Sequence, residues 1–421
     1  MPITLEVIDG PQCGHKFTFV AHDTFLVGRA ECAHFRLPKD DRYISRVHFL
    51  IESNPPACQL TDLGSRNGTM VNGTRVEKSN LKSGDLIQAG KTVFRVNISD
   101  QGEGGAKDTP PGPDVHLTTT ARQLPKPPET TAVTGSLPAP APPVLPAIPG
   151  YEVLRELGRG GMGVVYLAHR LDDNSAVAIK TIRPLAGGSQ QEVEHFLREA
   201  RILSQLQHPG IVRFEQIGEA GELLYFVMEY VDGSDAEREL KKHKRIAIRP
   251  VIQVVCQALD AIQYAHDLGY VHRDVKPSNL LLKKSGDVLT CKLADFGLAR
   301  VYNSSPLSGL TMMGDIGGTL AYMPPEQITD YRHARPPADQ YAAAATLYHM
   351  LTGYYIFDFA DVPNSRRISR ILFDRPVPIR SRRGDIPDGL DWVIERALEK
   401  EPQKRFASAA AFRAALLPFA V

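Results

Sequence analysis

From Pro2 to Ile98 the chain alternates apolar and polar residues in short runs. Alternation with a period of two is typical of strands that bury one face. Asn67-Gly68 and Asn72-Gly73 are the clearest turn signals between these runs. The pattern predicts an all-β sandwich, with strands at Thr4–Ile8, Lys16–Val20, Phe25–Val27, Val47–Ile51 and Lys91–Ile98.

Residues 99–149 lose this alternation and are rich in Pro, Gly, Thr and Ala, with few large apolar side chains. Such a segment buries too little surface to offset the entropy of ordering it. We therefore expect a disordered linker, whose proline-dense end, Leu137–Pro149, is extended and stiff. The clusters Thr118-Thr119-Thr120 and Thr130-Thr131 are either plain spacer or sites of phosphorylation.

Residues 150–421 show a second folded region, which begins with two apolar runs, Tyr151–Leu157 and Val164–Ala168. The glycines between them, Gly158, Gly160 and Gly163, fit a loop that lets the backbone approach phosphate oxygens. A strand-like segment follows the loop, which favours a hairpin over a dinucleotide-binding unit, where a helix would follow.

Further elements follow along the chain. Val177-Ala178-Ile179-Lys180 reads as a strand ending in a lysine. Ser189 and Glu192 form a capping box before apolar residues with helical period that continue to Leu206. Glu199, beside that apolar stripe, is either an exposed glutamate or the partner of Lys180, and we favour the pair. Tyr341–Leu351 is too short to cross a membrane and predicts a buried helix.

Candidate chemistry lies at His272-Arg273-Asp274-Val275-Lys276-Pro277-Ser278-Asn279, followed by Asp295-Phe296-Gly297. Asp274 can receive a hydroxyl proton, and Lys276 can neutralise a phosphate. Asn279 and Asp295 supply the oxygen ligands that Mg²⁺ needs. With the glycine loop and Lys180 upstream, this is the equipment of phosphoryl transfer.

Together these motifs resemble a eukaryotic-type protein kinase, over about Tyr151 to Leu417, and the glycine loop is most similar to bacterial Ser/Thr kinases. The resemblance implies an α+β bilobal fold that uses ATP with Mg²⁺ or Mn²⁺. It implies Asp274 as catalytic base, Lys276 on the γ-phosphate and a Lys180–Glu199 ion pair. It also implies that Asp339 braces the catalytic loop and that Arg405 pairs Glu326. The implied nucleotide contacts are Leu157, Gly158, Gly160, Gly163, Val165, Ala178, Lys180, Met228, Glu229, Val231 and Leu281, with Asn279 and Asp295 on the metal.

The same resemblance implies an activation segment from Asp295 to Glu326. Thr319 would lie against the substrate hydroxyl. Thr311, eight residues earlier, stands where related bacterial kinases often carry an activating phosphothreonine. A phosphate there could pair with Arg273 and order the segment.

The N-terminal region carries Gly28-Arg29, Ser45-Arg46-Val47-His48 and the stretch Asp62–Gly73 in an order that resembles a forkhead-associated (FHA) domain. The resemblance implies a phosphothreonine-binding sandwich, with Arg29 and Ser45 on the phosphate and Asn67 on the peptide backbone. Arg46 would contribute through its backbone, and His48 would hold the loop. Arg66 either adds phosphate charge or faces solvent.

Composition agrees with two folded domains, which we place at 1–98 and 150–421. The chain has 421 residues, 43% of them hydrophobic, and a formal net charge of +1, which offers no field for nucleic acid. Five cysteines without CxxC spacing indicate reduced thiols. The sequence shows no signal peptide. It also shows no apolar run long enough to span a membrane, including after the second domain, and we therefore expect a cytoplasmic protein.

The sequence thus predicts a Ser/Thr kinase that phosphorylates proteins, itself included, with a module for phosphothreonine partners. Trans-autophosphorylation would involve a transient homodimer. The basic runs Lys241–Arg245 and Arg366–Arg370 are either solvated faces or docking sites for substrate. The alternative function is a phosphorylation-dependent adaptor or scaffold with weak or absent kinase activity, although the intact Lys180, Asp274 and Asp295 speak against it.

Overall fold

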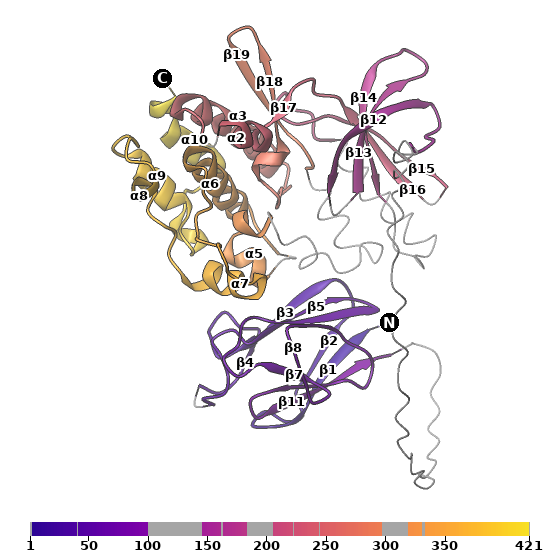
Figure 1. Cartoon of the computed structure of the whole chain (residues 1–421), viewed down its shortest axis with the longest axis vertical. Helices are drawn as coiled ribbons and strands as arrows, with labels where there is room; N and C mark the ends of the chain where they lie inside the picture. The colour runs from indigo at the N-terminus through magenta and orange to yellow at the C-terminus, as the bar shows by residue number, and fades with distance from the viewer. Residues whose placement is uncertain are drawn as a thin grey trace, which may run out of the picture.

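A computed structural model gives the architecture of the chain (Figure 1). It describes residues 2–39, 41–99, 145–160, 163–182, 205–221, 223–243, 245–296, 319–330 and 333–420. The helix predicted between Ser189 and Leu206 and the threonine clusters of the linker lie almost wholly outside these residues.

The N-terminal region forms a sandwich of two packed sheets, as predicted, and their strands pair antiparallel except for the parallel pair of β3 and β4. The first sheet has the order β2-β1-β11-β10-β7-β8 and the second β4-β3-β5-β6-β9. Their strands are β1 (Ile3–Asp9), β2 (Lys16–Phe19), β3 (Asp23–Gly28), β4 (Phe35–Arg36), β5 (Phe49–Asn54), β6 (Ala57–Asp62), β7 (Thr69–Val71), β8 (Thr74–Val76), β9 (Lys78–Asn80), β10 (Leu86–Ala89) and β11 (Thr92–Ile98).

The sandwich core follows the alternation read from the sequence. Phe49 and Phe94 meet edge-on between the sheets, with ring centroids 5.6 Å apart. Asn72 and Gly73 have φ values of 51° and 77° and join β7 to β8 in a tight hairpin, since both positions need the left-handed region. This confirms the turn predicted at Asn72-Gly73.

A five-stranded antiparallel sheet in the order β12-β13-β14-β16-β15 begins the second region. Its strands are β12 (Tyr151–Gly160), β13 (Gly163–Arg170), β14 (Ala176–Ile182), β15 (Phe214–Ala220) and β16 (Leu223–Glu229). β12 and β13 pair antiparallel, with Gly160 opposite Gly163. The hairpin predicted for the glycine loop is therefore confirmed, although Gly161 and Met162 lie outside the described residues.

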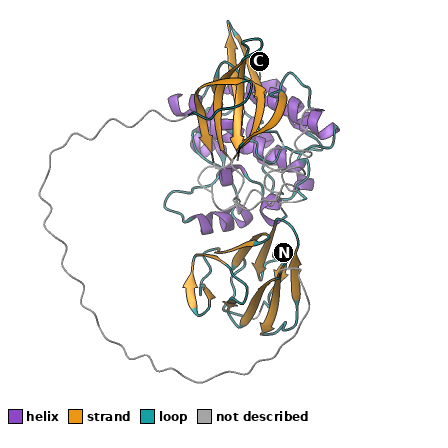
Figure 2. Ribbon diagram, turned by 90° about the vertical axis from the view of Figure 1, so that its right-hand side faces the viewer, coloured by secondary structure: helices purple, strands orange, loops and turns teal. Residues whose placement is uncertain are grey.

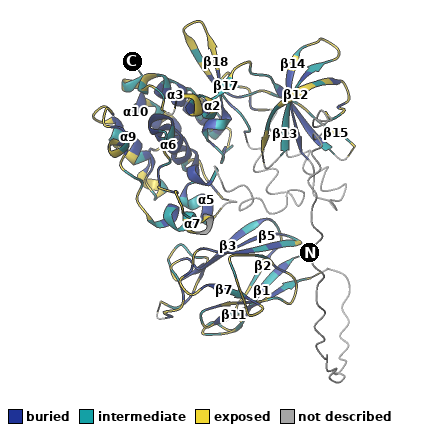
Figure 3. Ribbon diagram, viewed as in Figure 1, coloured by how far each residue is buried: buried dark blue, intermediate teal, exposed yellow. Residues whose placement is uncertain are grey.

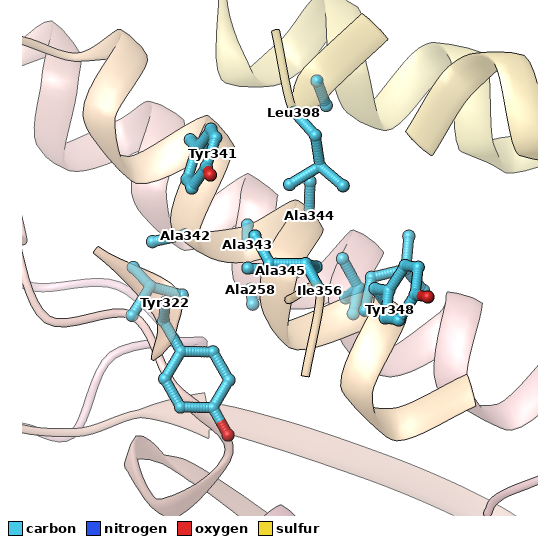
Figure 4. Close-up of a cluster of buried hydrophobic side chains, with 14 of the residues drawn as sticks. Ala258, Tyr322, Tyr341, Ala342, Ala343, Ala344, Ala345, Tyr348, Ile356 and Leu398 are labelled. Atoms are coloured by element: carbon cyan, nitrogen blue, oxygen red, sulfur yellow. The ribbon is translucent and has the colours of Figure 1, made fainter. Parts of the chain in front are cut away.

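Helices build the larger lobe (Figure 2). They are α2 (Ala236–His243), α3 (Ile248–Asp267), α5 (Pro325–Thr329), α6 (Pro337–Thr352), α7 (Asn364–Phe373), α8 (Ile379–Arg382), α9 (Leu390–Ala397) and α10 (Ala409–Leu416). α6 is buried along almost its whole length, which confirms the buried helix predicted at Tyr341–Leu351. Figure 4 shows its alanines and tyrosines against Ile356 and Leu398.

A small sheet, β17 (Ser234–Asp235), β18 (Leu280–Ser285) and β19 (Val288–Leu293), lies on this lobe. It positions the candidate site, because the loop that carries Asp274 leads through Asn279 into β18, and Asp295 follows β19. Among the described helices, none is long and apolar enough to cross a membrane.

Candidate functional site

A buried carboxylate fixes the loop that carries Asp274. Asp339, on α6, accepts the backbone N–H groups of His272 and Arg273, each at 2.8 Å, and contacts His266 Nε2 at 2.8 Å. Burial alone would raise the pKa of Asp339. The hydrogen bond and charge of His266 more than offset this, so its pKa lies below the usual value. The side chain therefore acts as an anion that clamps the loop, which confirms the bracing role expected for Asp339.

Asp274 is held by two neighbours and has one oxygen left over. Asn279 Nδ2 donates to its carbonyl at 2.8 Å and to Oδ2 at 3.1 Å, and Lys276 Nζ lies 3.0 Å from Oδ2. Oδ1 is buried and has no hydrogen-bond partner within the described part of the chain. A buried acceptor without a partner is costly unless a ligand supplies one. Asp274 Oδ1 is thus left open to a hydrogen-bond donor from a ligand.

Lys276 also reaches Thr319 Oγ1 at 2.9 Å. Thr319 begins the short helix Thr319–Tyr322, at the far end of the predicted activation segment. One lysine therefore joins the candidate base to the position expected beside the substrate hydroxyl. Its ammonium lies where it can meet both a hydroxyl and a phosphate.

Lys180, on β14, forms an ion pair with Asp295, with 2.8 Å between Nζ and Oδ2. Burial would raise the pKa of Asp295, but the ammonium of Lys180, followed by Lys276, lowers it below the usual value. Asp295 has a φ of 59°, a left-handed conformation that non-glycine residues rarely adopt. Such strain is typical of functional sites.

Asn279 and Asp295 carry side-chain oxygens of the kind that a magnesium site uses. Asn279 uses its amide nitrogen on Asp274, so its amide oxygen remains the acceptor of that side chain. Asp295 is kept anionic, and anionic and amide oxygens are the ligands that Mg²⁺ prefers. Two protein ligands suffice for Mg²⁺ where phosphates complete the shell.

The predicted nucleotide contacts lie on neighbouring strands. Val165 faces Lys180 across β13 and β14, and Ala178 faces Met228 across β14 and β16. Glu229 ends β16 and pairs with Lys292. The remaining predicted contacts are placed on β12 and β13 (Leu157, Gly158, Gly160, Gly163), just after β16 (Val231) and on β18 (Leu281).

The hairpin needs glycine for two reasons: a Cβ would clash with neighbouring atoms, and a bare backbone lets phosphate oxygens come close. A Cβ on Gly163 would lie 1.9 Å from the carbonyl oxygen of Thr181, and its φ is 144°. Gly158 and Gly160 have nothing within 4 Å of an added Cβ among the described residues. The first two glycines leave the backbone open, whereas Gly163 packs the hairpin onto β14.

Glu326 is clamped by Arg405, as expected. Arg405 Nη1 lies 2.5 Å and Nη2 2.8 Å from the two carboxylate oxygens, and the arginine side chain is fully buried. The next residue, Gln327, donates to the carbonyl of Arg273 at 2.8 Å. Sequence reasoning missed Gln327, because one glutamine in a short helix carries no distinguishing pattern. α5 thereby contacts the catalytic loop directly.

A second cluster lies on the loops at one end of the sandwich. Arg29 N–H donates to the carbonyl of Ser45 at 3.2 Å, and Ser45 Oγ accepts the N–H of Arg66 at 3.0 Å. Asn67 Nδ2 donates to the carbonyl of Tyr43 at 2.9 Å. These hydrogen bonds join three loops through the residues that are predicted to bind phosphothreonine. Four of those residues have exposed side chains: Arg29, Arg46, Arg66 and Asn67.

His48 supports this cluster from below. Ser45 N–H donates to its Nδ1 at 3.2 Å, and its Nε2 lies 3.2 Å from the carbonyl of Gly68. Burial lowers the pKa of His48, so the neutral ring that these two bonds require is favoured.

Two of the predicted sites, Glu199 and Thr311, lie outside the described residues.

Comparisons with known families agree with both regions. The family model for the protein kinase domain matches residues 151–417, and the model for the FHA domain matches residues 25–90. Serine/threonine-protein kinase PknB of Mycolicibacterium smegmatis is 36% identical over 272 residues, which cover 63% of this chain and 42% of the relative. The kinase pkn3 of Myxococcus xanthus is 34% identical over 275 residues, covering 63% and 49%. The chain therefore spans less than half the length of these relatives.

Solved structures show similar folds. A structure of Rad53 residues 1–466 in complex with AMP-PNP aligns over the whole of both chains, with a TM-score of 0.53 and 22% identity, a likeness of fold alone. A double mutant of the Mycobacterium tuberculosis PknI kinase domain aligns over 65% of this chain and 96% of that domain. Its TM-score is 0.52 and its identity 29%.

Proposed function

The chain belongs to the protein kinase family, in its bacterial serine/threonine branch with an N-terminal FHA domain, and we propose that it transfers the γ-phosphate of ATP to serine or threonine residues of proteins, itself included. The observation that carries this proposal is the arrangement around Asp274. The loop joins a buried carboxylate oxygen that has no hydrogen-bond partner among the described residues, an ammonium at 3.0 Å and the amide of Asn279.

In the proposed reaction, Asp274 Oδ1 accepts the proton of the substrate hydroxyl while the hydroxyl oxygen attacks the γ-phosphorus. The bond from that phosphorus to the oxygen bridging the β- and γ-phosphates breaks, and ADP leaves with the electron pair. The ammonium of Lys276 contacts the carboxylate of Asp274 and would also contact the γ-phosphate. A bound Mg²⁺, held by Asn279 and Asp295, would neutralise charge on the phosphates. Lys180 fixes Asp295 in place, and its own position on β14 is rigid because the strand is almost fully buried.

The FHA region would bind phosphothreonine on protein partners. A phosphate on threonine carries close to two negative charges at neutral pH. Arg29 and the hydroxyl of Ser45 can donate to it, while Asn67 can contact the peptide backbone beyond it. Such partners would be recruited to the catalytic domain by the tether of residues 99–149, and transient pairing of two chains would allow phosphorylation in trans.

Phosphate transfer to a generic protein substrate tests the proposal and separates it from a scaffold role. We expect the wild-type chain with ATP and Mg²⁺ to phosphorylate the substrate and itself. Asp274→Asn should lower the rate at least a hundredfold, because removal of one transition-state contact costs about 3 kcal/mol or more. Phosphosite mapping of the same samples identifies the acceptors. Equal rates in both proteins would contradict catalysis at Asp274 and favour the adaptor.

A further inference from the structure

Two strands of the second sheet of the FHA domain, β3 and β5, are buried on both faces. Side chains alternate across a strand, so Leu26 and Leu50 lie opposite the sandwich core that Phe25 and Phe49 enter. Both leucines are nevertheless 0–1% exposed and belong to the hydrophobic cluster of the large lobe. β3 contacts α5, and Figures 1 and 2 both show the sandwich against this side of the lobe. Figure 3 marks most residues of β3 and β5 as buried.

Loops of the FHA domain also contact α7. The guanidinium carbon of Arg46 lies 4.2 Å from the centroid of the Phe373 ring. Ser369 Oγ lies 3.4 Å from the carbonyl oxygen of Leu63. The side chain of Arg366 lies so close to Gly64 that a Cβ there would be 2.5 Å from its Cγ. The domain is therefore docked on α5 and α7 of its own chain.

The docked interface is incompletely packed. An open cleft of about 450 Å³ lies between the two domains, lined by Arg46 and Gly64 on one side and by Asp361, Arg366, Arg370 and Asp374 on the other. Permanent interfaces are packed as densely as protein interiors, whereas contacts between domains of one chain are commonly reversible. An open cleft along the contact favours docking that can be undone.

Arg46 connects this interface with the phosphothreonine site. It directly follows Ser45, and its guanidinium is committed to Phe373 in the docked state. A dianionic phosphate beside Ser45 would attract that guanidinium away from the ring. The cleft also holds Arg366 and Arg370 beside the carboxylates of Asp361 and Asp374, so a phosphate there would meet charges of both signs, and the competition turns on Arg46.

We propose that docking on α5 and α7 competes with phosphothreonine binding, so that a phosphothreonine ligand releases the FHA domain from the large lobe. The inference rests on the proposed phosphothreonine binding and adds its regulation by the chain itself. Docking reduces the apparent affinity by the fraction of molecules whose Arg46 guanidinium is free of Phe373. By reciprocity, the ligand weakens docking by the same factor.

Affinity measurements on the full chain test this competition. The probe is a phosphothreonine peptide selected from a degenerate library on the wild-type chain, measured by calorimetry. Phe373→Ala, which leaves the FHA domain untouched, should bind it about two- to fivefold more tightly, the equivalent of one cation–π contact. Trp392→Ala is the matched control, since it removes an aromatic ring that carries Arg396 at 5.3 Å on α9. The control should bind like wild type.

The possible results separate the inference from the function on which it rests. Absence of binding to every peptide would refute phosphothreonine recognition and, with it, the competition. Equal affinities in wild type and Phe373→Ala would overturn the competition alone. Weaker binding by Phe373→Ala would mean that α7 helps to hold the phosphate, and would also overturn it. Arg366→Ala provides a second variant, with the same expected direction, if Phe373→Ala fails to fold.

Hydrogen exchange gives an independent readout of release. In the wild-type chain, the phosphothreonine peptide should increase amide exchange across Asn364–Phe373, a helix of the other domain. The unphosphorylated peptide should leave exchange there unchanged. Unchanged or slower exchange in this helix at saturating phosphopeptide would contradict release.

Discussion

Asp339 Oδ1 accepts a hydrogen bond from the backbone N–H of Arg273 at 2.8 Å, although the two residues are 66 positions apart. Oδ2 of the same carboxylate accepts the N–H of His272. The conformation of the catalytic loop is thus set by an anion on α6. Arg273 itself has a φ of 69°, so the loop is held in a shape that its own residue type disfavours.

Replacement of this anion should impair catalysis more than folding. In Asp339→Asn, an amide NH₂ would face one of the two backbone N–H groups, and a hydrogen bond to a charged group, worth about 1.5–3 kcal/mol, would be lost. We expect kcat to fall by about tenfold to a hundredfold, because Asp274 would no longer be positioned. Initial rates with a protein substrate measure this. Asp267→Asn, at an exposed carboxylate near the end of α3, is the control. Wild-type kcat in Asp339→Asn would show that the loop holds itself.

The contiguous motifs could be interpreted from the sequence, because the residues that act together lie in one short segment. Asp274, Lys276 and Asn279 contact one another within a single loop. Gln327 could not be foreseen, since its role depends on a carbonyl 54 residues away that only the tertiary fold brings near.

Little in the sequence indicates that the outer face of β3 and β5 contacts the large lobe. Leu50 stands between Phe49 and Ile51 and interrupts the alternation of β5, so that both faces of the strand are apolar. Such a run is also typical of a central strand in a larger sheet. The sequence therefore could not tell whether the outer face meets solvent, another chain or the kinase lobe.

Phosphothreonine recognition should depend on Arg29. A charge-assisted hydrogen bond contributes about 1.5–3 kcal/mol, so Arg29→Ala should weaken peptide binding by roughly tenfold to a hundredfold. Titration of the peptide selected on the wild-type chain measures this. Arg95→Ala removes an exposed arginine from β11 and controls for net charge. If both variants bind equally well, Arg29 does not contact the phosphate.

The buried ion pair of Glu326 and Arg405, at the end of the predicted activation segment, should be essential for stability. Arg405→Met would leave Glu326 without its partner, and it would also remove the donor to the carbonyl of Pro337. Loss of one partner of a buried pair commonly costs about 3–5 kcal/mol. Arg413→Met breaks an exposed pair with Asp260 and should cost about 1 kcal/mol or less. Urea unfolding of the two variants compares these costs, and similar midpoints would contradict a special role for Glu326–Arg405.

Stability should also depend on a histidine outside the catalytic site. Tyr322 Oη lies 2.6 Å from His349 Nδ1, so the neutral imidazole is the form that can accept a hydrogen bond from the tyrosine hydroxyl. Burial lowers the pKa of His349 from 6.5 to about 4, and the charge of Glu237 offsets this only in part. In the unfolded chain the imidazole would be protonated already below its ordinary pKa. Between these two pKa values the unfolded state therefore binds more protons than the folded state.

The sign of the pH dependence follows from this difference. The free energy of unfolding should fall as the pH falls through the window from 6.5 to about 4, by at most about 1.4 kcal/mol per pH unit from this group. His349→Gln keeps an acceptor for Tyr322 but cannot titrate, so its pH dependence in this window should be shallower than that of wild type. His333→Gln, whose side chain is 76% exposed, should match wild type. Thermal or urea unfolding at several pH values measures the slopes, and an unchanged slope in His349→Gln would mean that other groups set the acid stability of the large lobe.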